Sequence, residues 1–253
     1  MNKETHLRNL SDLFNLRSNL SNPFNLRSNL RSNLRSNLRS FRCVVFDMDG
    51  TLTNTNALIF HSFNHLAEEY LGKHLTPEEI IAFFGPPEEG AVEKMLGADF
   101  LPEAMKKYYA FYSDKHDEFA SLHEGMREVL EFLKQHGIAR GLFTGKGRQA
   151  TEISLEKFGI ADLFDAVITG DDVAEYKPSG DGLRRIMRQL SVKPEETLMV
   201  GDAVGDIVAA RDAGVAIASV LWDSYGKSDV LKMDSDFLFD TVPHFREWIA
   251  TCI

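Results

Sequence analysis

The sequence predicts an α/β fold, a doubly wound parallel sheet covered by helices and interrupted by an inserted helical unit. Two observations support this prediction. Short apolar runs alternate with amphipathic segments from residue 42 onward, and parallel strands need crossover connections, which are usually helical. One interval, 56–121, departs from the alternation because it contains helical patterns and no convincing strand.

Six segments have the length and composition of buried strands. They are 42–47, 138–144, 164–169, 196–201, 215–221 and a less apolar 236–239. Amphipathic helices are expected at 125–137, 148–159, 180–190 and 203–214. In the first of these, Met126, Val129, Leu130 and Leu133 share one face, and Gly137 is a typical residue after a helix end.

The inserted unit is expected to contain four helices, at 56–71, 77–84, 88–97 and 102–118. It enters directly after "DMDGTLTNT" and ends near "LHEG". The predicted core is therefore discontinuous and consists of 42–55 and 122–253, and residues 56–121 form a cap.

Residues 1–41 form a low-complexity segment that repeats Asn-Leu-Arg-Ser and contains Pro23. Asn and Ser favour caps and turns and proline interrupts helices, so we predict a disordered tail. Its composition fits an organelle-targeting segment or a basic tail for anionic surfaces. The near-exact repetition favours a tandem expansion without a specific role.

The net charge of −10 excludes some partners. Residues 1–42 carry eight Lys or Arg against Glu4 and Asp12, so the rest of the chain is strongly acidic, which argues against nucleic acid as the partner. Two cysteines are too few for a disulfide framework, and no apolar run approaches the ~20 residues of a membrane span. We expect a cytoplasmic protein with no membrane partner, and composition leaves its oligomeric state open.

Reactive side chains follow four of the predicted strands. Ligands of open α/β sheets bind at the carboxyl ends of the strands. The candidates are Asp47 and Asp49 after the first strand, Thr144 after the second, Lys177 beyond Asp171 and Asp172 after the third, and Asp202 and Asp206 after the fourth. A single aspartate in such a place is usually a cap or turn residue, but four ends occupied in this way indicate a site.

These residue types suit phosphoryl transfer with a metal ion. Asp47 and Asp202 on adjacent strand ends would repel each other unless a hard cation lay between them, and Mg²⁺ prefers oxygen ligands. Asp47 could then attack phosphorus, while Asp49 exchanged protons with the leaving oxygen and the attacking water.

Five residues are candidates for phosphate binding. The Thr144 hydroxyl and the Lys177 ammonium would contact the phosphoryl oxygens. Gly50 would let the backbone bend close to the phosphate. Thr51 and Gly145, next to these residues in the sequence, complete the predicted phosphate-binding set.

The chain resembles the haloacid dehalogenase (HAD) superfamily of phosphohydrolases. The resemblance rests on four ordered motifs: "DMDGT" (47–51), "LFTG" (142–145), "YKPSGDGL" (176–183) and "GDAVGDIVAARDAG" (201–214). It implies a Rossmann-like core with Asp47 as nucleophile and Asp49 as acid/base. It also implies Mg²⁺ ligation by Asp47, Asp202 and the Asp49 backbone carbonyl, with Asp206 supporting the metal waters.

The helical insertion resembles the cap of the phosphoglycolate phosphatase and β-phosphoglucomutase branch. The expected function is a Mg²⁺-dependent phosphatase acting on a small phosphoglycolate-like metabolite through an aspartyl-phosphate. "TGKGR" (144–148) departs from the Thr-Asn-Lys common in phosphoglycolate phosphatases. An inorganic pyrophosphatase, a sugar-phosphate mutase and a non-catalytic phosphate-binding protein are the alternatives.

Two charged stretches near these motifs have competing interpretations. Lys146 and Arg148 fit a solvated helix start better than a phosphate contact. In "FFGPPEEG" (83–90), Glu88 and Glu89 could complement the dipole of the next helix, or the turn could contact the leaving group.

Overall fold

A computed structural model describes residues 41–253 of the chain. The predicted disordered tail, 1–41, lies outside the described residues except for its last residue. Phe41 is fully buried, and its ring packs near those of Phe237 and Trp248. Phe41 therefore belongs to the folded part of the chain.

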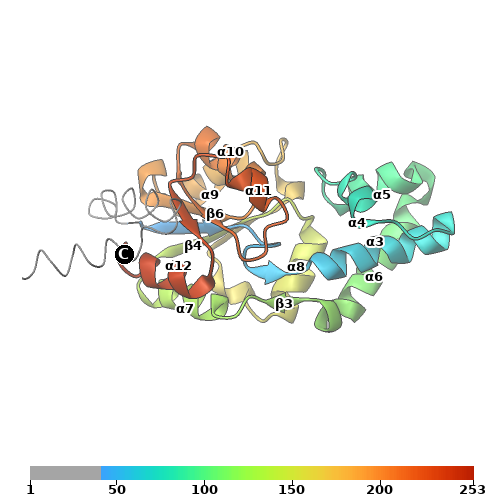
Figure 1. Ribbon diagram of the computed structural model, residues 1–253, viewed down its shortest axis with the longest axis horizontal. Helices are drawn as coiled ribbons and strands as arrows, with labels where there is room; N and C mark the ends of the chain where they lie inside the picture. The colour runs from blue at the N-terminus through green and yellow to red at the C-terminus, as the bar shows by residue number, and fades with distance from the viewer. Residues whose placement is uncertain (1–40) are drawn as a thin grey trace, which may run out of the picture. The chain divides into compact units, whose positions relative to one another are not determined.

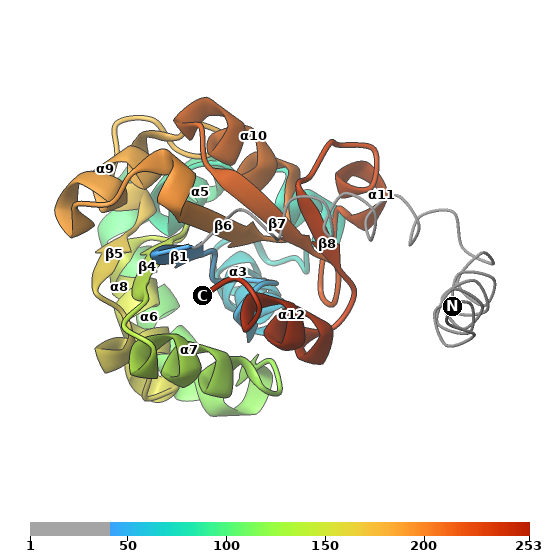
Figure 2. The ribbon, with the colours of Figure 1, turned by 90° about the vertical axis from the view of Figure 1, so that its left-hand side faces the viewer.

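The core is a sheet of six parallel strands in the order β5-β4-β1-β6-β7-β8. Figure 2 shows the strands side by side. They are β1 (Cys43–Phe46), β4 (Ala139–Phe143), β5 (Ala166–Ile168), β6 (Thr197–Gly201), β7 (Ala216–Val220) and β8 (Phe237–Phe239). Each lies within one of the six predicted segments, and the predicted doubly wound α/β fold is confirmed.

Helices cover both faces of this sheet, as the alternation of strands and helices requires. On one side lie α7 (Met126–Gln135) and α12 (Val242–Ile249), and on the other α9 (Asp181–Leu190) and α10 (Val204–Ala213) (Figure 2). Side chains of β1 alternate between the two apolar cores because successive strand residues point to opposite faces. Val44 therefore packs in the core of α7 and α12, and the next residue in the core of α9 and α10.

Residues after β1 form a group of helices with its own apolar core, to the right of the sheet in Figure 1. Its helices are α3 (Asn56–Leu71), α4 (Pro77–Ile81), α5 (Glu88–Leu96) and α6 (Leu101–Phe119). Leu58, Phe63, Tyr108 and Tyr112 are fully buried or nearly so within it. We propose that 56–121 is the cap, and that 42–55 with 122–253 is the core.

A short antiparallel ribbon joins the two parts and was not predicted from the sequence. It pairs β2 (Thr53–Asn54) with β3 (Ser121–Leu122). Two residues per strand carry no readable alternation of apolar and polar side chains. Through this pairing, the segment that leaves the core lies next to the segment that returns to it.

Helix α8 (Arg148–Lys157) follows β4 and contributes to both apolar regions. Its Leu155 packs in the core of α7 and α12, whereas Ala150 packs with the cap helices. Side chains of α6 bond to it, because the Tyr112 hydroxyl lies 2.9 Å from Ser154 Oγ. Helix α8 therefore forms part of the contact between the core and the cap.

Replacing Gly182 by alanine should destabilise the core. Gly182 is the second residue of α9, and a Cβ there would lie 2.1 Å from the buried ring of Phe143. Such overpacking costs about 1–3 kcal/mol of unfolding free energy, measurable by urea denaturation. Gly205 is the matched control because it is the second residue of α10 and its added Cβ would meet only Lys177 Cβ, at 3.7 Å. An equal loss in both variants would contradict the packing argument.

Candidate active site

Three adjacent strands bring the predicted site residues together. Strand β1 lies between β4 and β6, so the residues that follow the three strands share one edge of the sheet. Asp47 follows β1, Thr144 follows β4, and Asp202 follows β6. The Asp47 backbone N–H donates to Val200 O at 2.9 Å, so the backbone of this aspartate is fixed by the sheet.

Three buried carboxylates cluster at this edge. Asp47, Asp202 and Asp206 each offer an oxygen, and these oxygens all lie within 4.8 Å of one another. Burial raises the pKa of Asp47 to about 7, against the opposing effect of the Lys177 charge. Burial, with the negative charges of Asp47 and Asp206, also raises the pKa of Asp202 well above its usual value. The cluster therefore tends to bind protons or a nearby cation.

Lys177 supplies part of that positive charge. Its ammonium lies 2.5 Å from Asp47 Oδ1 and 2.7 Å from Asp206 Oδ1. Burial alone would lower the Lys177 pKa, but the two carboxylates outweigh it and raise the pKa above its usual value. The ammonium also lies 4.9 Å from the centre of the Phe143 ring. Lys177 is therefore a fixed cation beside the predicted nucleophile.

Gly50 and Thr51 both lie against the carboxylate of Asp202. Thr51 is fully buried and its hydroxyl donates to Asp202 Oδ1 at 2.8 Å. Gly50 has φ +82°, and a Cβ there would lie 2.5 Å from Asp202 Oδ2. The phosphate contacts expected of both residues stay a prediction, and the structure adds their contacts with the carboxylate that follows the neighbouring strand.

Asp49 is held on both of its carboxylate oxygens. The Thr55 hydroxyl donates to Oδ1, and Lys146 Nζ lies 3.1 Å from Oδ2. The Thr55 hydroxyl is itself 3.2 Å from Thr53 Oγ1. Residues of the ribbon and its flank thus orient the predicted acid/base.

Lys146 is buried, although the sequence favoured a solvated helix start. Its side chain is 2% exposed and lies between Asp49 and Glu88, whose Oε1 is 3.3 Å from Nζ. Burial lowers the Lys146 pKa, but the negative charges of Asp49 and Glu88 outweigh it and hold the pKa well above its usual value. Lys146 and Glu88 are the functional candidates that sequence reasoning missed.

A cavity of about 360 Å³ joins these groups to the cap. Every predicted site residue lines it except Gly50 and Thr51. The opposite wall is largely apolar and comes from the cap, with Ile59, Phe63, Ile81, Phe84 and Ala91. A phosphoryl group at the carboxylates would therefore place the rest of a substrate against cap residues.

The carboxylate cluster fits a divalent cation such as Mg²⁺. All three acids offer carboxylate oxygens, which are the ligands that Mg²⁺ prefers. The raised pKa values of Asp47 and Asp202 show that their shared negative charge is unfavourable without further positive charge. Asp206 also accepts from Ala203 N at 3.0 Å, which fixes its carboxylate beside the other two.

A parallel α/β sheet with buried acids and a lysine at its carboxyl edge is the arrangement of a hydrolase that acts on phosphate esters. Comparison with known families agrees with that class. The family model for the haloacid dehalogenase-like hydrolase matches residues 44–220. The chain belongs to this family and is an enzyme of the phosphatase type.

Relatives extend over most of the chain. The pyrophosphatase PpaX of Bacillus thuringiensis (strain Al Hakam) is 36% identical over 197 residues, which are 78% of this chain and 91% of the relative. A putative haloacid dehalogenase-like hydrolase from Bacteroides fragilis has a TM-score of 0.69 at 25% identity and covers 81% of this chain and 100% of its own.

A putative phosphoglycolate phosphatase from Lactobacillus plantarum has a TM-score of 0.68 at 22% identity, and the match covers 83% of this chain and 99% of that one. At this identity the likeness concerns the fold. Across residues 41–253, no helix combines the length and apolar character that a membrane span requires.

Proposed function

We propose that the protein is a Mg²⁺-dependent phosphatase that releases phosphate from a small metabolite through an aspartyl-phosphate on Asp47. One observation carries the proposal, the buried group formed by Asp47, Asp202, Asp206 and Lys177 beneath a cavity large enough for a small ester. Burying a charged group of this kind lowers the stability of the fold, and such groups are concentrated at functional sites.

In the first step a carboxylate oxygen of Asp47 attacks phosphorus. The bond from phosphorus to the leaving oxygen breaks, and Asp49 gives its proton to that oxygen. Lys177, 2.5 Å from Asp47, balances charge on the phosphoryl oxygens. Thr144, which lines the same cavity, offers its hydroxyl to those oxygens.

In the second step water releases the phosphate. Asp49 takes a proton from the water, whose oxygen attacks phosphorus, and the bond between phosphorus and Asp47 breaks. The products are inorganic phosphate and the original enzyme.

Asp47, Asp202 and the Asp49 backbone carbonyl would hold the Mg²⁺, with Asp206 beside them. When bound, the cation supplies the positive charge that the carboxylates and the phosphoryl oxygens share.

We propose a small phosphoglycolate-like phosphomonoester as the substrate, in line with the predicted cap type. Inorganic pyrophosphate is the second candidate, because the relative at 36% identity is named a pyrophosphatase. Both are small enough for the cavity of about 360 Å³.

A panel of phosphorylated metabolites tests this proposal, with release of inorganic phosphate as the readout. The enzyme with Mg²⁺ should hydrolyse p-nitrophenyl phosphate and then show its highest kcat/KM on one member of the panel. The panel should include phosphoglycolate, pyrophosphate and a sugar bisphosphate. Binding of these compounds without any turnover would contradict the proposal and favour a non-catalytic phosphate-binding protein.

A further inference from the structure

One residue of the cap makes two contacts with the core loop that follows β4. Glu88 Oε2 accepts from the Gly147 backbone N–H at 2.6 Å, and Oε1 lies 3.3 Å from Lys146 Nζ. The Glu88 side chain is 8% exposed and that of Lys146 is 2% exposed. A carboxylate on the first turn of α5 thus crosses from the cap into the core.

The same lysine reaches the predicted acid/base. Its ammonium lies 3.1 Å from Asp49 Oδ2 and 5.2 Å from the centre of the Tyr112 ring. Glu88, Lys146 and Asp49 form a continuous chain, which we call the cap–core bridge. The Thr55 hydroxyl donates to the other oxygen of Asp49. Within residues 41–253, the ion pairs of Lys146 connect Asp49 to Glu88 of the cap.

The bridge is held by charges that compensate one another in a buried place. Burial raises the pKa of Glu88, against the opposing effect of the Lys146 charge. Removing one partner of a buried ion pair leaves the other charge uncompensated, so the rest of the bridge would rearrange. Lys146 without Glu88 would have only Asp49 as a charged partner among the described residues.

We propose that Glu88 is a positioning residue for Asp49. Through Lys146 it holds the Asp49 carboxyl in its working orientation, and it does so only while α5 of the cap lies against the loop after β4. This inference rests on the proposed function, because it requires Asp49 to exchange a proton with the leaving oxygen. Loss of the bridge would therefore weaken proton transfer more than nucleophilic attack.

The leaving group reports on that distinction. When the bond from phosphorus to the leaving oxygen breaks, Asp49 donates a proton to that oxygen. A weakly basic oxygen, as in p-nitrophenolate, departs readily without the proton, whereas a strongly basic one needs it. A misplaced Asp49 therefore slows esters of basic leaving groups selectively, which a general loss of folding or binding does not.

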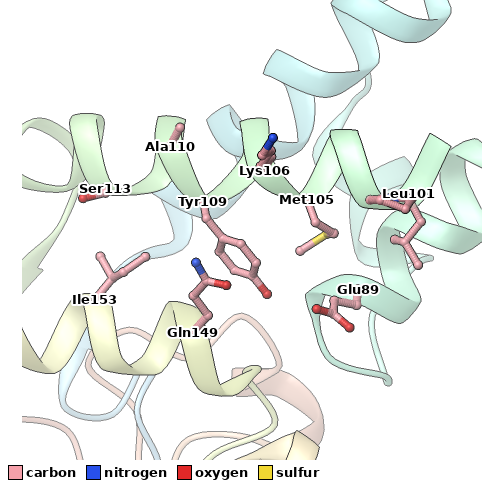
Figure 3. Close-up of a pocket in the computed structure, with 10 residues that line it drawn as sticks. Glu89, Leu101, Met105, Lys106, Tyr109, Ala110, Ser113, Gln149 and Ile153 are labelled. Atoms are coloured by element: carbon pink, nitrogen blue, oxygen red, sulfur yellow. The ribbon is translucent and has the colours of Figure 1, made fainter.

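The test compares Glu88→Gln with wild type on phenyl phosphate and p-nitrophenyl phosphate, which differ by one nitro group. Glutamine keeps the size of the side chain and removes its charge. Glu89→Gln is the matched control, since Glu89 is the next residue in the same helix turn and is exposed. Figure 3 shows Glu89 near Met105 and Tyr109. These residues line a second pocket, of about 680 Å³, whose lining includes none of the three bridge residues.

We expect kcat/KM on phenyl phosphate to fall at least tenfold further than kcat/KM on p-nitrophenyl phosphate in Glu88→Gln, in view of the 10²–10⁴-fold contribution of general acids. The ratio kcat/KM covers only the steps up to departure of the leaving group, whereas kcat also contains the hydrolysis of the aspartyl-phosphate, which both esters share. KM should change little in this variant. The Glu89→Gln control should keep both rates within about twofold of wild type.

A second variant separates positioning from folding. Lys146→Met should reproduce the selective loss, and the double variant with Glu88→Gln should lose less than the sum of the two single effects, because the residues act as one unit. Equal losses of kcat/KM on both esters, or additive effects, would overturn the inference. If wild type hydrolyses neither ester, the proposed function fails instead, so the two failures are distinguishable.

Discussion

The Asp47→Asn variant should lose phosphate release by a factor on the order of 10⁴ to 10⁶, as removal of a nucleophile does in other hydrolases. The asparagine amide oxygen carries no negative charge and cannot attack phosphorus as a carboxylate does. The Asn side chain has nearly the same volume, and Lys177 keeps its contact with Asp206 at 2.7 Å. The variant should therefore fold and still bind phosphate.

Release of phosphate and the circular dichroism spectrum check this prediction together. Asp240→Asn is the control, because Asp240 follows β8 at the same edge of the sheet but is exposed and outside the cavity. That control should keep the wild-type rate. An Asp47→Asn protein that folds and retains more than about one hundredth of the wild-type kcat would remove the nucleophile role from Asp47.

The sheet and the carboxylate cluster were predictable because both follow from short-range patterns. Apolar runs of five or six residues mark buried strands, and parallel strands place their carboxyl ends at one edge. Asp47 and Asp202 lie 155 positions apart in the sequence, yet their strands pair directly. With these two strands as neighbours, a parallel sheet brings the two side chains to the same edge.

Lys146 and Glu88 were not predictable because their burial depends on how the cap packs. A lysine at the start of a helix is usually solvated, and only the contact of α5 with the loop after β4 buries this one. Glu88 does stand in the first turn of α5, as the dipole interpretation expects. Its second contact, across to the core, has no local sequence signal.

The contacts of Gly50 and Thr51 with Asp202 were also not predicted from the sequence. Gly50 was expected to let the backbone bend close to the phosphate, and that expectation stays a prediction. In the structure the positive φ of Gly50 turns the chain against Asp202, and Thr51 bonds that carboxylate. The neighbouring strand, invisible to a local pattern, determines what these residues contact.

Chelation of the metal should abolish turnover, and excess Mg²⁺ should restore it. Without the cation, burial raises the pKa of Asp47 well above its usual range, which favours the protonated form over the nucleophilic carboxylate. Phosphate release before EDTA, after EDTA and after added Mg²⁺ is the measurement. A rate that EDTA leaves unchanged would remove the metal from the mechanism.

Thermal unfolding is a second test for Mg²⁺ binding at the carboxylate cluster, and it needs no substrate. A carboxyl group whose pKa rises on folding binds more protons in the folded state, so the metal-free protein loses stability as pH rises from 3.8 toward about 7. Mg²⁺ binds the folded state and competes with those protons for the same oxygens. Adding Mg²⁺ should therefore raise the unfolding midpoint more at about pH 8 than at about pH 5.5. An equal shift at both pH values would mean that the cation binds away from Asp47 and Asp202.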